Sequence, residues 1–99
     1  MGYAVTMTSP AHKMLRKLPA SIRKHLVKKA QKLSANPSLG QPLEGVLRGF
    51  LSLRTVYRRT HYRIIYEISH RLREVIVRGA GPRENLYRKL ERMRLKPLS

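Results

Sequence analysis

The sequence predicts an α+β fold, in which a small antiparallel sheet carries two N-terminal helices on one face and is followed by a C-terminal helix. Apolar residues recur with helical spacing in the first third of the chain and near its end, and with strand alternation between them. Proline and glycine separate these segments. The 99 residues, 41% of them hydrophobic, are enough for one domain over residues 1–99 with a modest core.

The N-terminal third predicts a strand and two helices. Residues 3–8 alternate loosely and predict an edge strand. Ser9 and Pro10 are typical of an N-cap and the first position of a helix. Pro19 interrupts this helix, and a second one is predicted over residues 20–35. The two apolar stripes are Ala11, Met14, Leu15 and Leu18, then Ile22, Leu26, Ala30 and Leu33.

The rest of the chain predicts a strand meander and a last helix. Residues 36–49 contain three glycines and two prolines and predict a loop. The predicted strands are residues 47–57, 61–69 and 72–79, joined by turns at 58–60 and 69–71. Pro82 is expected to open a helix whose apolar stripe is Leu86, Leu90 and Met93. The order of elements is therefore β-α-α-β-β-β-α, with the second sheet face at least partly open.

The charge predicts a polyanionic partner. Lys and Arg number 22 against 5 acidic residues, all of them Glu, so the net charge is +17. A compact chain with this charge repels itself, and binding to nucleic acid is the usual reason for it. No apolar run reaches the ~18–20 residues of a membrane-spanning helix, so we expect no membrane partner.

Composition also limits the chemistry. Cysteine is absent, which excludes disulfides and thiolate metal sites. Five scattered Glu and four His without metal-ligand spacing do not suggest a metal site, so we expect neither a metal nor another cofactor. A cytoplasmic location is the default expectation for such a chain.

Lysine and arginine are distributed differently. Six of the eight Lys lie between Lys13 and Lys32, whereas eleven of the fourteen Arg lie between Arg54 and Arg94. Lysine suits solvated helix faces that attract polyanions at long range; arginine suits fixed, bidentate phosphate contacts. The helix lysines that we expect to face RNA are Lys24, Lys28 and Lys32.

The sequence resembles the RelE/ParE superfamily of bacterial type II toxins over nearly its whole length. The strand Tyr62-Arg63-Ile64-Ile65-Tyr66 followed by Gly81-x-Arg83-x-x-x-Tyr87 carries most of the resemblance. The other matching segments are Tyr3-Ala4-Val5, Ala11 to Pro19, Ile22-Arg23, Asn36-Pro37, Pro42-Leu43-x-Gly45 and Leu53-Arg54.

The resemblance implies a fold, an activity and a partner. RelE-like members are mRNA interferases that cut mRNA in the ribosomal A site, and ParE-like members poison DNA gyrase. Both kinds are neutralised by an antitoxin with an acidic tail. For this chain we expect an acidic RelB-like antitoxin that either displaces the C-terminal helix or covers the arginines, and mRNA on the ribosome as substrate.

The resemblance also implies site residues. Metal-free RNA cleavage uses the 2′-OH as nucleophile and needs a base, an acid and cations that stabilise the phosphorane. Arg54 and Arg63 match strand positions that would hold the scissile phosphate. Arg83 matches the catalytic arginine between strand and helix, and Tyr87 matches a tyrosine that stacks on the nucleotide.

This chain departs from the family where a base is expected. The two lysines that precede Leu-Arg in RelE are missing here, since residues 50–52 are Phe-Leu-Ser, and Pro82 stands where some subfamilies have His. The candidate bases are His61 and Glu84. Residues 56–62 look longer than in RelE and place Arg58 and Arg59 at a hairpin tip that could grip ribosomal RNA.

Three functions therefore stay open: a ribosome-dependent endoribonuclease, a ParE-like gyrase inhibitor, and a non-catalytic RNA- or ribosome-binding member. Several other residues have simple structural interpretations. Tyr62 and Tyr66 are expected to pack in the core, and Glu67 to pair with a neighbouring Arg in the sheet. The histidines expected at plain surface positions are His12, His25 and His70.

Overall fold

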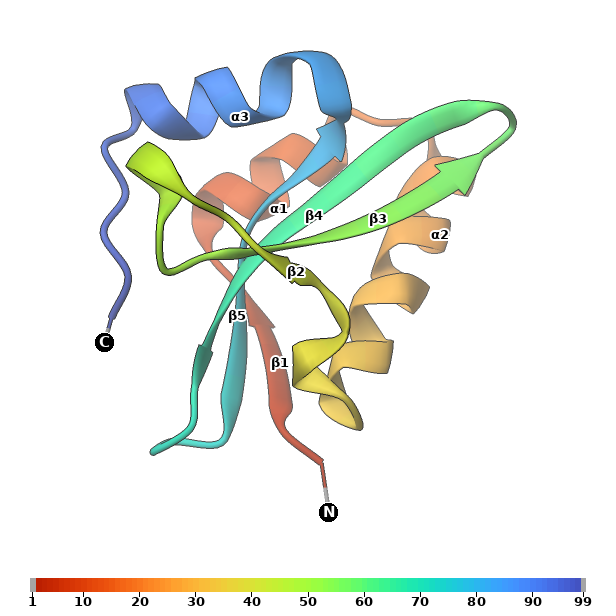
Figure 1. Ribbon diagram of the computed structural model, residues 1–99. Helices are drawn as coiled ribbons and strands as arrows, with labels where there is room; N and C mark the ends of the chain where they lie inside the picture. The colour runs from red at the N-terminus through yellow and green to blue at the C-terminus, as the bar shows by residue number, and fades with distance from the viewer. Residues whose placement is uncertain (1, 99) are drawn as a thin grey trace.

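In the computed structural model, which describes residues 2–98, a five-stranded sheet carries helices on both of its faces (Figure 1). The elements in chain order are β1 (Ala4–Met7), α1 (Ser9–Arg16), α2 (Ala20–Gln31), the 3-10 turns η1 (Lys32–Ser34) and η2 (Pro37–Leu39), β2 (Gln41–Pro42), the 3-10 turn η3 (Gly45–Leu47), β3 (Leu51–Tyr57), β4 (Thr60–Ser69), β5 (Glu74–Pro82) and α3 (Arg83–Arg92). The α+β class is confirmed, as is the order of the predicted elements.

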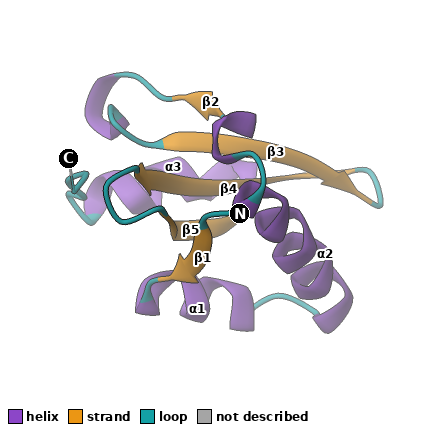
Figure 2. Cartoon of the chain, turned by 90° about the horizontal axis from the view of Figure 1, so that it is seen from below, coloured by secondary structure: helices purple, strands orange, loops and turns teal. Residues whose placement is uncertain are grey.

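The sheet is mixed rather than wholly antiparallel. Its strand order is β1-β5-β4-β3-β2, which Figure 2 shows with α1 and α2 beside it. Strands β3, β4 and β5 form the predicted antiparallel meander. Strand β1 lies at the edge, as predicted, but pairs with β5 in parallel, with Val5 opposite Val75. The direction of this pairing depends on how the chain returns through two helices and the meander, which the residues of β1 do not encode.

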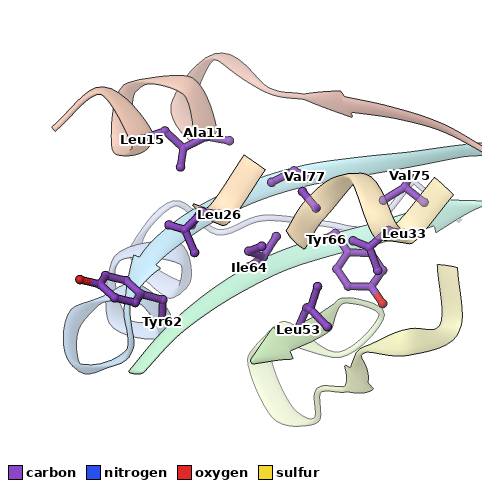
Figure 3. Packing of buried hydrophobic residues seen from close by; sticks show 12 residues of the cluster. Ala11, Leu15, Leu26, Leu33, Leu53, Tyr62, Ile64, Tyr66, Val75 and Val77 are labelled. Atoms are coloured by element: carbon purple, nitrogen blue, oxygen red, sulfur yellow. The ribbon is translucent and has the colours of Figure 1, made fainter. Parts of the chain in front are cut away.

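The larger core lies between the sheet and the two N-terminal helices. Alternate residues of β4 and β5 point into it, among them Ile64, Tyr66 and Val77, all nearly inaccessible to solvent (Figure 3). The helix stripes supply the other side, with Leu15 of α1 and Leu26 of α2 in the same cluster. Each such side chain stabilises the fold by about 1.5–3 kcal/mol when fully buried. Tyr62 and Tyr66 are therefore core residues, as predicted.

A smaller core lies on the opposite sheet face. Ile65 of β4 and Phe50 pack there against Leu86 and Leu90 of α3. Because α3 is short, it covers only part of this face, and the segment that ends β5 and the middle of β3 stay outside the cluster. The expectation of a partly open second face is therefore confirmed.

A buried carboxylate, which is also part of an ion pair, connects the C-terminal tail to this second face. Glu67, which is almost fully buried, accepts a hydrogen bond from the guanidinium of Arg78 and another from the backbone N–H of Leu98. The predicted pairing of Glu67 with an arginine of the sheet is confirmed. Arg78 also lies over the ring of Phe50, 5.7 Å from its centroid, so its guanidinium packs against the smaller core.

Several element boundaries differ from the predictions. The N-cap of α1 is Thr8, one residue before the predicted Ser9, because the Thr8 hydroxyl accepts the Ala11 N–H at 3.3 Å. The predicted loop contains the short strand β2, and β3 begins at Leu51 because Gly49, with φ +97°, turns the chain just before it. Strand β5 runs on to Pro82, where α3 begins.

The hydroxyl of Tyr66 fixes the segment that leads into β2. It donates to the carbonyl of Pro37 at 2.6 Å and accepts the N–H of Gly40 at 2.8 Å. A Cβ on Gly40 would lie 2.7 Å from this hydroxyl, so only glycine allows the close approach. The central strand thereby places Gln41 at the edge of the sheet.

Replacing Tyr66 by Phe should lower the free energy of unfolding by about 1–3 kcal/mol, because the buried N–H of Gly40 and the partly buried carbonyl of Pro37 lose their partner. Chemical denaturation measures the change. Tyr62→Phe is the matched control, since the Tyr62 hydroxyl bonds to no residue between 2 and 98. Equal losses in both variants would contradict the role of the Tyr66 hydroxyl.

The same hydroxyl should make stability depend on alkaline pH. Burial raises the pKa of Tyr66 above its ordinary value of 10.0, and the Gly40 N–H only partly offsets this rise. The folded chain then holds the phenolic proton more tightly than the unfolded chain. This contribution to stability is complete below pH 10 and is lost as the pH rises through the pKa of Tyr66 in the folded chain. The difference in unfolding free energy between wild type and Tyr66→Phe should therefore become smaller as the pH rises above 10.

Candidate phosphate-binding site

Two arginines face each other in the open part of the second sheet face. Arg54 of β3 and Arg63 of β4 are direct cross-strand partners, so their side chains leave the sheet on the same side. Arg54 is exposed, whereas Arg63 retains only 5% of its accessible surface. Like charges directly opposite each other destabilise a strand pair, so this arrangement costs folding free energy unless an anion binds between them.

Arg63 has no carboxylate partner within the described chain. Its guanidinium donates to the carbonyl of Tyr62 at 3.3 Å, and no ion pair joins it to a carboxylate of residues 2–98, whereas Glu67 is paired with Arg78. A buried cation without a counter-ion is costly. On the second sheet face, β4 thus carries one carboxylate, Glu67, and one arginine, Arg63, and Glu67 is already paired with Arg78.

Residues of three elements surround the two arginines. Arg54 donates to the side-chain oxygen of Gln41 at 3.3 Å, which orients it toward β2. The Tyr87 hydroxyl of α3 lies 2.9 Å from the hydroxyl of Ser52 on β3. Together they enclose a hollow of about 150 Å³, lined by Gln41, Pro42, Leu43, Ser52, Arg54, Arg63 and Tyr87. We call it the arginine hollow.

A second, wider hollow begins on the other side of Tyr87. It measures about 730 Å³ and is lined by Arg59, Thr60, His61, Pro82, Arg83, Glu84 and Tyr87. Tyr87 lines both hollows, so they form one continuous surface along α3 and the ends of β4 and β5. Arg83 and Glu84 are exposed in the first turn of α3, directly after Pro82.

The fold therefore brings the predicted site residues together. Arg54, Arg63 and Tyr87 share the arginine hollow. Arg83 shares the wider hollow with both candidate bases. Ser52 and Gln41 were not predicted, because only the register of β2 on β3 places Gln41 opposite Ser52.

The hairpin tip between β3 and β4 has a strained backbone. Arg58 and Arg59 both have positive φ, at 50° and 69°, in a two-residue turn where glycine or asparagine is usual. Each such residue costs of order 1 kcal/mol or more. Both side chains are exposed, so the turn gives up stability to present two cations.

The lysines that were expected to face RNA are exposed but lie outside the hollows. Lys24 and Lys28 belong to α2, which ends at Gln31, and Lys32 is the first residue of η1; none of them lines a hollow described here. Lys29, which was not predicted to bind RNA, lines a third hollow together with Arg54.

The three histidines that were expected at the surface differ in exposure. His12 and His70 are exposed, as expected, but His25 is half-buried, because its ring is held against β3. The residues around His25 predict a helix, but this local pattern does not predict a contact with β3.

Residues 2–98 contain neither a metal-binding cluster nor a membrane-spanning helix. No group of three or more His, Asp or Glu side chains within residues 2–98 is arranged to hold a metal ion. No helix in that range combines the length and the apolar character that crossing a membrane requires.

Comparisons with known proteins place the chain among toxins. The family described as ParE-like toxin of type II bacterial toxin–antitoxin systems matches residues 5–91. A chain of the RelBE2 toxin–antitoxin complex from Mycobacterium tuberculosis is 33% identical, with TM-score 0.75, over 84% of this chain and 100% of that one. A search of curated proteins gave no match.

Two further solved structures share the fold. A mutant of the toxin RelE of E. coli in its free state is 25% identical, with TM-score 0.73, over 92% of this chain and 94% of that one. The archaeal RelE–RelB complex from Pyrococcus horikoshii contains a chain that is 20% identical, with TM-score 0.60, over 85% of this chain and 98% of that one.

Replacing Arg63 by Met should raise the free energy of unfolding by about 1 kcal/mol or more, because a buried charge without a counter-ion is removed while its volume is kept. Chemical denaturation measures the change. Arg54→Met is the matched control: it removes the opposing charge at an exposed position and should change stability by less than about 0.5 kcal/mol. A destabilised Arg63→Met would show that the guanidinium holds the fold together.

Proposed function

Since the chain belongs to the ParE-like toxin family of type II bacterial toxin–antitoxin systems, we propose that it is an endoribonuclease that cuts mRNA on the ribosome without a metal ion. The observation that carries the proposal is the buried Arg63, which lies opposite Arg54 and has no carboxylate partner in residues 2–98. A phosphate between the two guanidinium groups would supply the missing negative charge.

The arrangement supports 2′-OH attack on the adjacent phosphate. A base takes the proton of the 2′-OH, the 2′-oxygen bonds to phosphorus, and the 5′-oxygen leaves as the P–O bond breaks and an acid protonates it. Arg54 and Arg63 bind the non-bridging oxygens, whose charge grows in the phosphorane. Arg83, on the far side of Tyr87, stabilises that charge or the leaving oxygen, while the ring of Tyr87 stacks on a base.

Two side chains can serve as the base. His61, near the start of β4, and Glu84, in the first turn of α3, line the same hollow as Arg83. The chain has no lysine on β3, and Tyr87 is a third candidate acceptor in the same hollow.

The likeness to toxins solved with RelB-type antitoxins supports an acidic protein partner. We propose that an acidic RelB-like antitoxin neutralises this chain, since a net charge of +17 favours a partner rich in Asp and Glu. Such a segment would fold on the surface that carries the arginines. Added in excess to the cleavage reaction below, it should stop cutting.

Contacts with ribosomal RNA are proposed for the hairpin tip and for one helix. Arg58 and Arg59 extend from the end of β3 on a strained turn, which favours a role outside the fold itself. Three exposed lysines of α2 and of the start of η1 would add long-range attraction to phosphate: Lys24, Lys28 and Lys32.

Arg83→Ala should reduce cleavage of a translated message by about 100- to 1000-fold, the loss typical when one group that stabilises transition-state charge is removed. Primer extension should show new ends within codons for wild type and none for Arg83→Ala. Arg88→Ala, on an exposed position of the same helix outside both hollows, should still cut. Equal cutting by wild type and Arg83→Ala would contradict the assignment.

The same preparation should be assayed for inhibition of DNA gyrase, because the matching family is named after ParE and β3 lacks the lysines of RelE. Unaffected supercoiling at micromolar protein, together with cut messages, supports the endoribonuclease. Inhibited supercoiling without cut messages would replace it by a gyrase poison, and ribosome binding without either effect would indicate a non-catalytic member.

The base should be identified by chemical rescue. If His61 is the base, His61→Ala should lose about 100- to 10,000-fold in rate, and added imidazole should restore part of it. If Glu84 is the base, Glu84→Ala should show the loss and formate the recovery. Single-turnover cleavage on programmed ribosomes measures both; full activity of both variants would leave Tyr87 as the proton acceptor.

A further inference from the structure

A third hollow lies between α2 and the edge of the sheet. Strand β2 pairs only with Leu51 and Ser52, so the edge of β3 beyond them has no strand partner among the described residues. Helix α2 runs beside this part of β3, and the β3–β4 hairpin extends past it (Figure 1). The hollow measures about 510 Å³ and is lined by His25, Lys29, Arg54, Thr55, Val56 and His61. We call it the α2–β3 groove.

The groove is positively charged on both walls. Lys29 contributes from α2 and Arg54 from β3, while none of the five glutamates lines it. Neither cation forms an ion pair with a residue in the range 2–98. The groove therefore attracts an anion rather than completing an internal salt bridge.

The ring of His25, which lines the groove, is held in a fixed orientation. The ring nitrogen Nε2 of His25 lies 2.7 Å from the hydroxyl of Thr55. The same ring stacks on Tyr57, with centroids 4.8 Å apart and planes inclined by 36°, and the guanidinium of Arg58 lies 5.3 Å from the Tyr57 centroid. Rings already held by packing and a hydrogen bond lose little entropy when a base stacks on them.

The groove adjoins the arginine hollow. Arg54 lines both, and His61 connects the groove to the wider hollow of Arg83. A single strand with one phosphate between Arg54 and Arg63 can therefore continue over the free edge of β3 toward α2. Unpaired backbone groups of that edge can bond to its sugar or phosphate.

We propose that the α2–β3 groove is a second RNA subsite, in which Lys29 binds a phosphate that flanks the scissile one and the ring of His25, held against Tyr57, stacks on a base. This inference rests on the proposed function, since it takes single-stranded RNA as the ligand of Arg54 and Arg63. It assigns RNA-binding roles to His25 and Lys29, which take no part in the proposed cleavage step.

The test uses the full chain and RNA in which every 2′-OH is methylated, so that binding occurs without cutting. A dinucleotide fills the arginine hollow alone, and a longer oligonucleotide also reaches the groove. Lys29→Gln should lower the slope of log affinity against log salt for the longer RNA by about 0.7, which is about fivefold in affinity at about 0.1 M salt. Its affinity for the dinucleotide should stay unchanged.

Matched controls separate binding in the groove from the general effect of net charge on RNA affinity. Lys13→Gln removes the same charge from an exposed position of α1 and should leave both affinities unchanged. His25→Ala should weaken the longer RNA but not a version whose flanking nucleotides lack bases. Thermal unfolding of each variant shows that it is folded.

Equal effects of Lys29→Gln and Lys13→Gln, or none from either, would overturn the inference. So would a Lys29→Gln variant that loses affinity for a Glu-rich peptide but not for RNA, because the groove would then dock a protein. If wild type cuts messages while the Lys29 effect is absent, only the second subsite fails. If the Lys29 effect is present but no message is cut, the endoribonuclease fails and the subsite stands.

Discussion

The central strand β4 is buried on both faces, and the positions of the core and of the site depend on its alternation. Tyr62, Ile64 and Tyr66 point into the core beneath α1 and α2, while Arg63, Ile65 and Glu67 point to the face partly covered by α3. A shift of one residue would put two charged side chains into the larger core, so the register of β4 is strongly determined. The same alternation brings a buried arginine to the side where Arg54 of β3 also emerges.

Charge is distributed unevenly on that second face. Its buried carboxylate, Glu67, binds Arg78 and the backbone of Leu98, and so holds the tail against the sheet. Arg63, four residues earlier on the same strand, is left without a counter-ion in the described chain. An ordinary structural arginine would be paired there, because the fold gains nothing from an isolated buried charge. Stability given up at a fixed position is typical of a functional site.

Short elements determine how much of the sheet is open. Helix α3 covers only part of the second sheet face, and its N-terminal half brings Arg83 and Tyr87 beside the hollow that Arg54 and Arg63 line. Strand β2, held in place through Gly40 and Tyr66, pairs with only two residues of β3. The rest of the β3 edge is thus available beside α2, where His25 and Thr55 fix one another. The arginine hollow and the α2–β3 groove therefore both lie where short elements leave part of the sheet without a covering strand or helix.

The sequence by itself determined the helices, the three meander strands and the residues of their cores, because apolar periodicity and proline positions are local signals. It also indicated Arg54, Arg63, Arg83 and Tyr87 through their spacing in a recognisable motif. Only the tertiary structure decided that β1 pairs in parallel with β5, that Gln41 and Ser52 join the site, and that His25 and Lys29 face Arg54. These facts depend on the direction and register in which distant segments meet, and no local pattern of residue types carries that information.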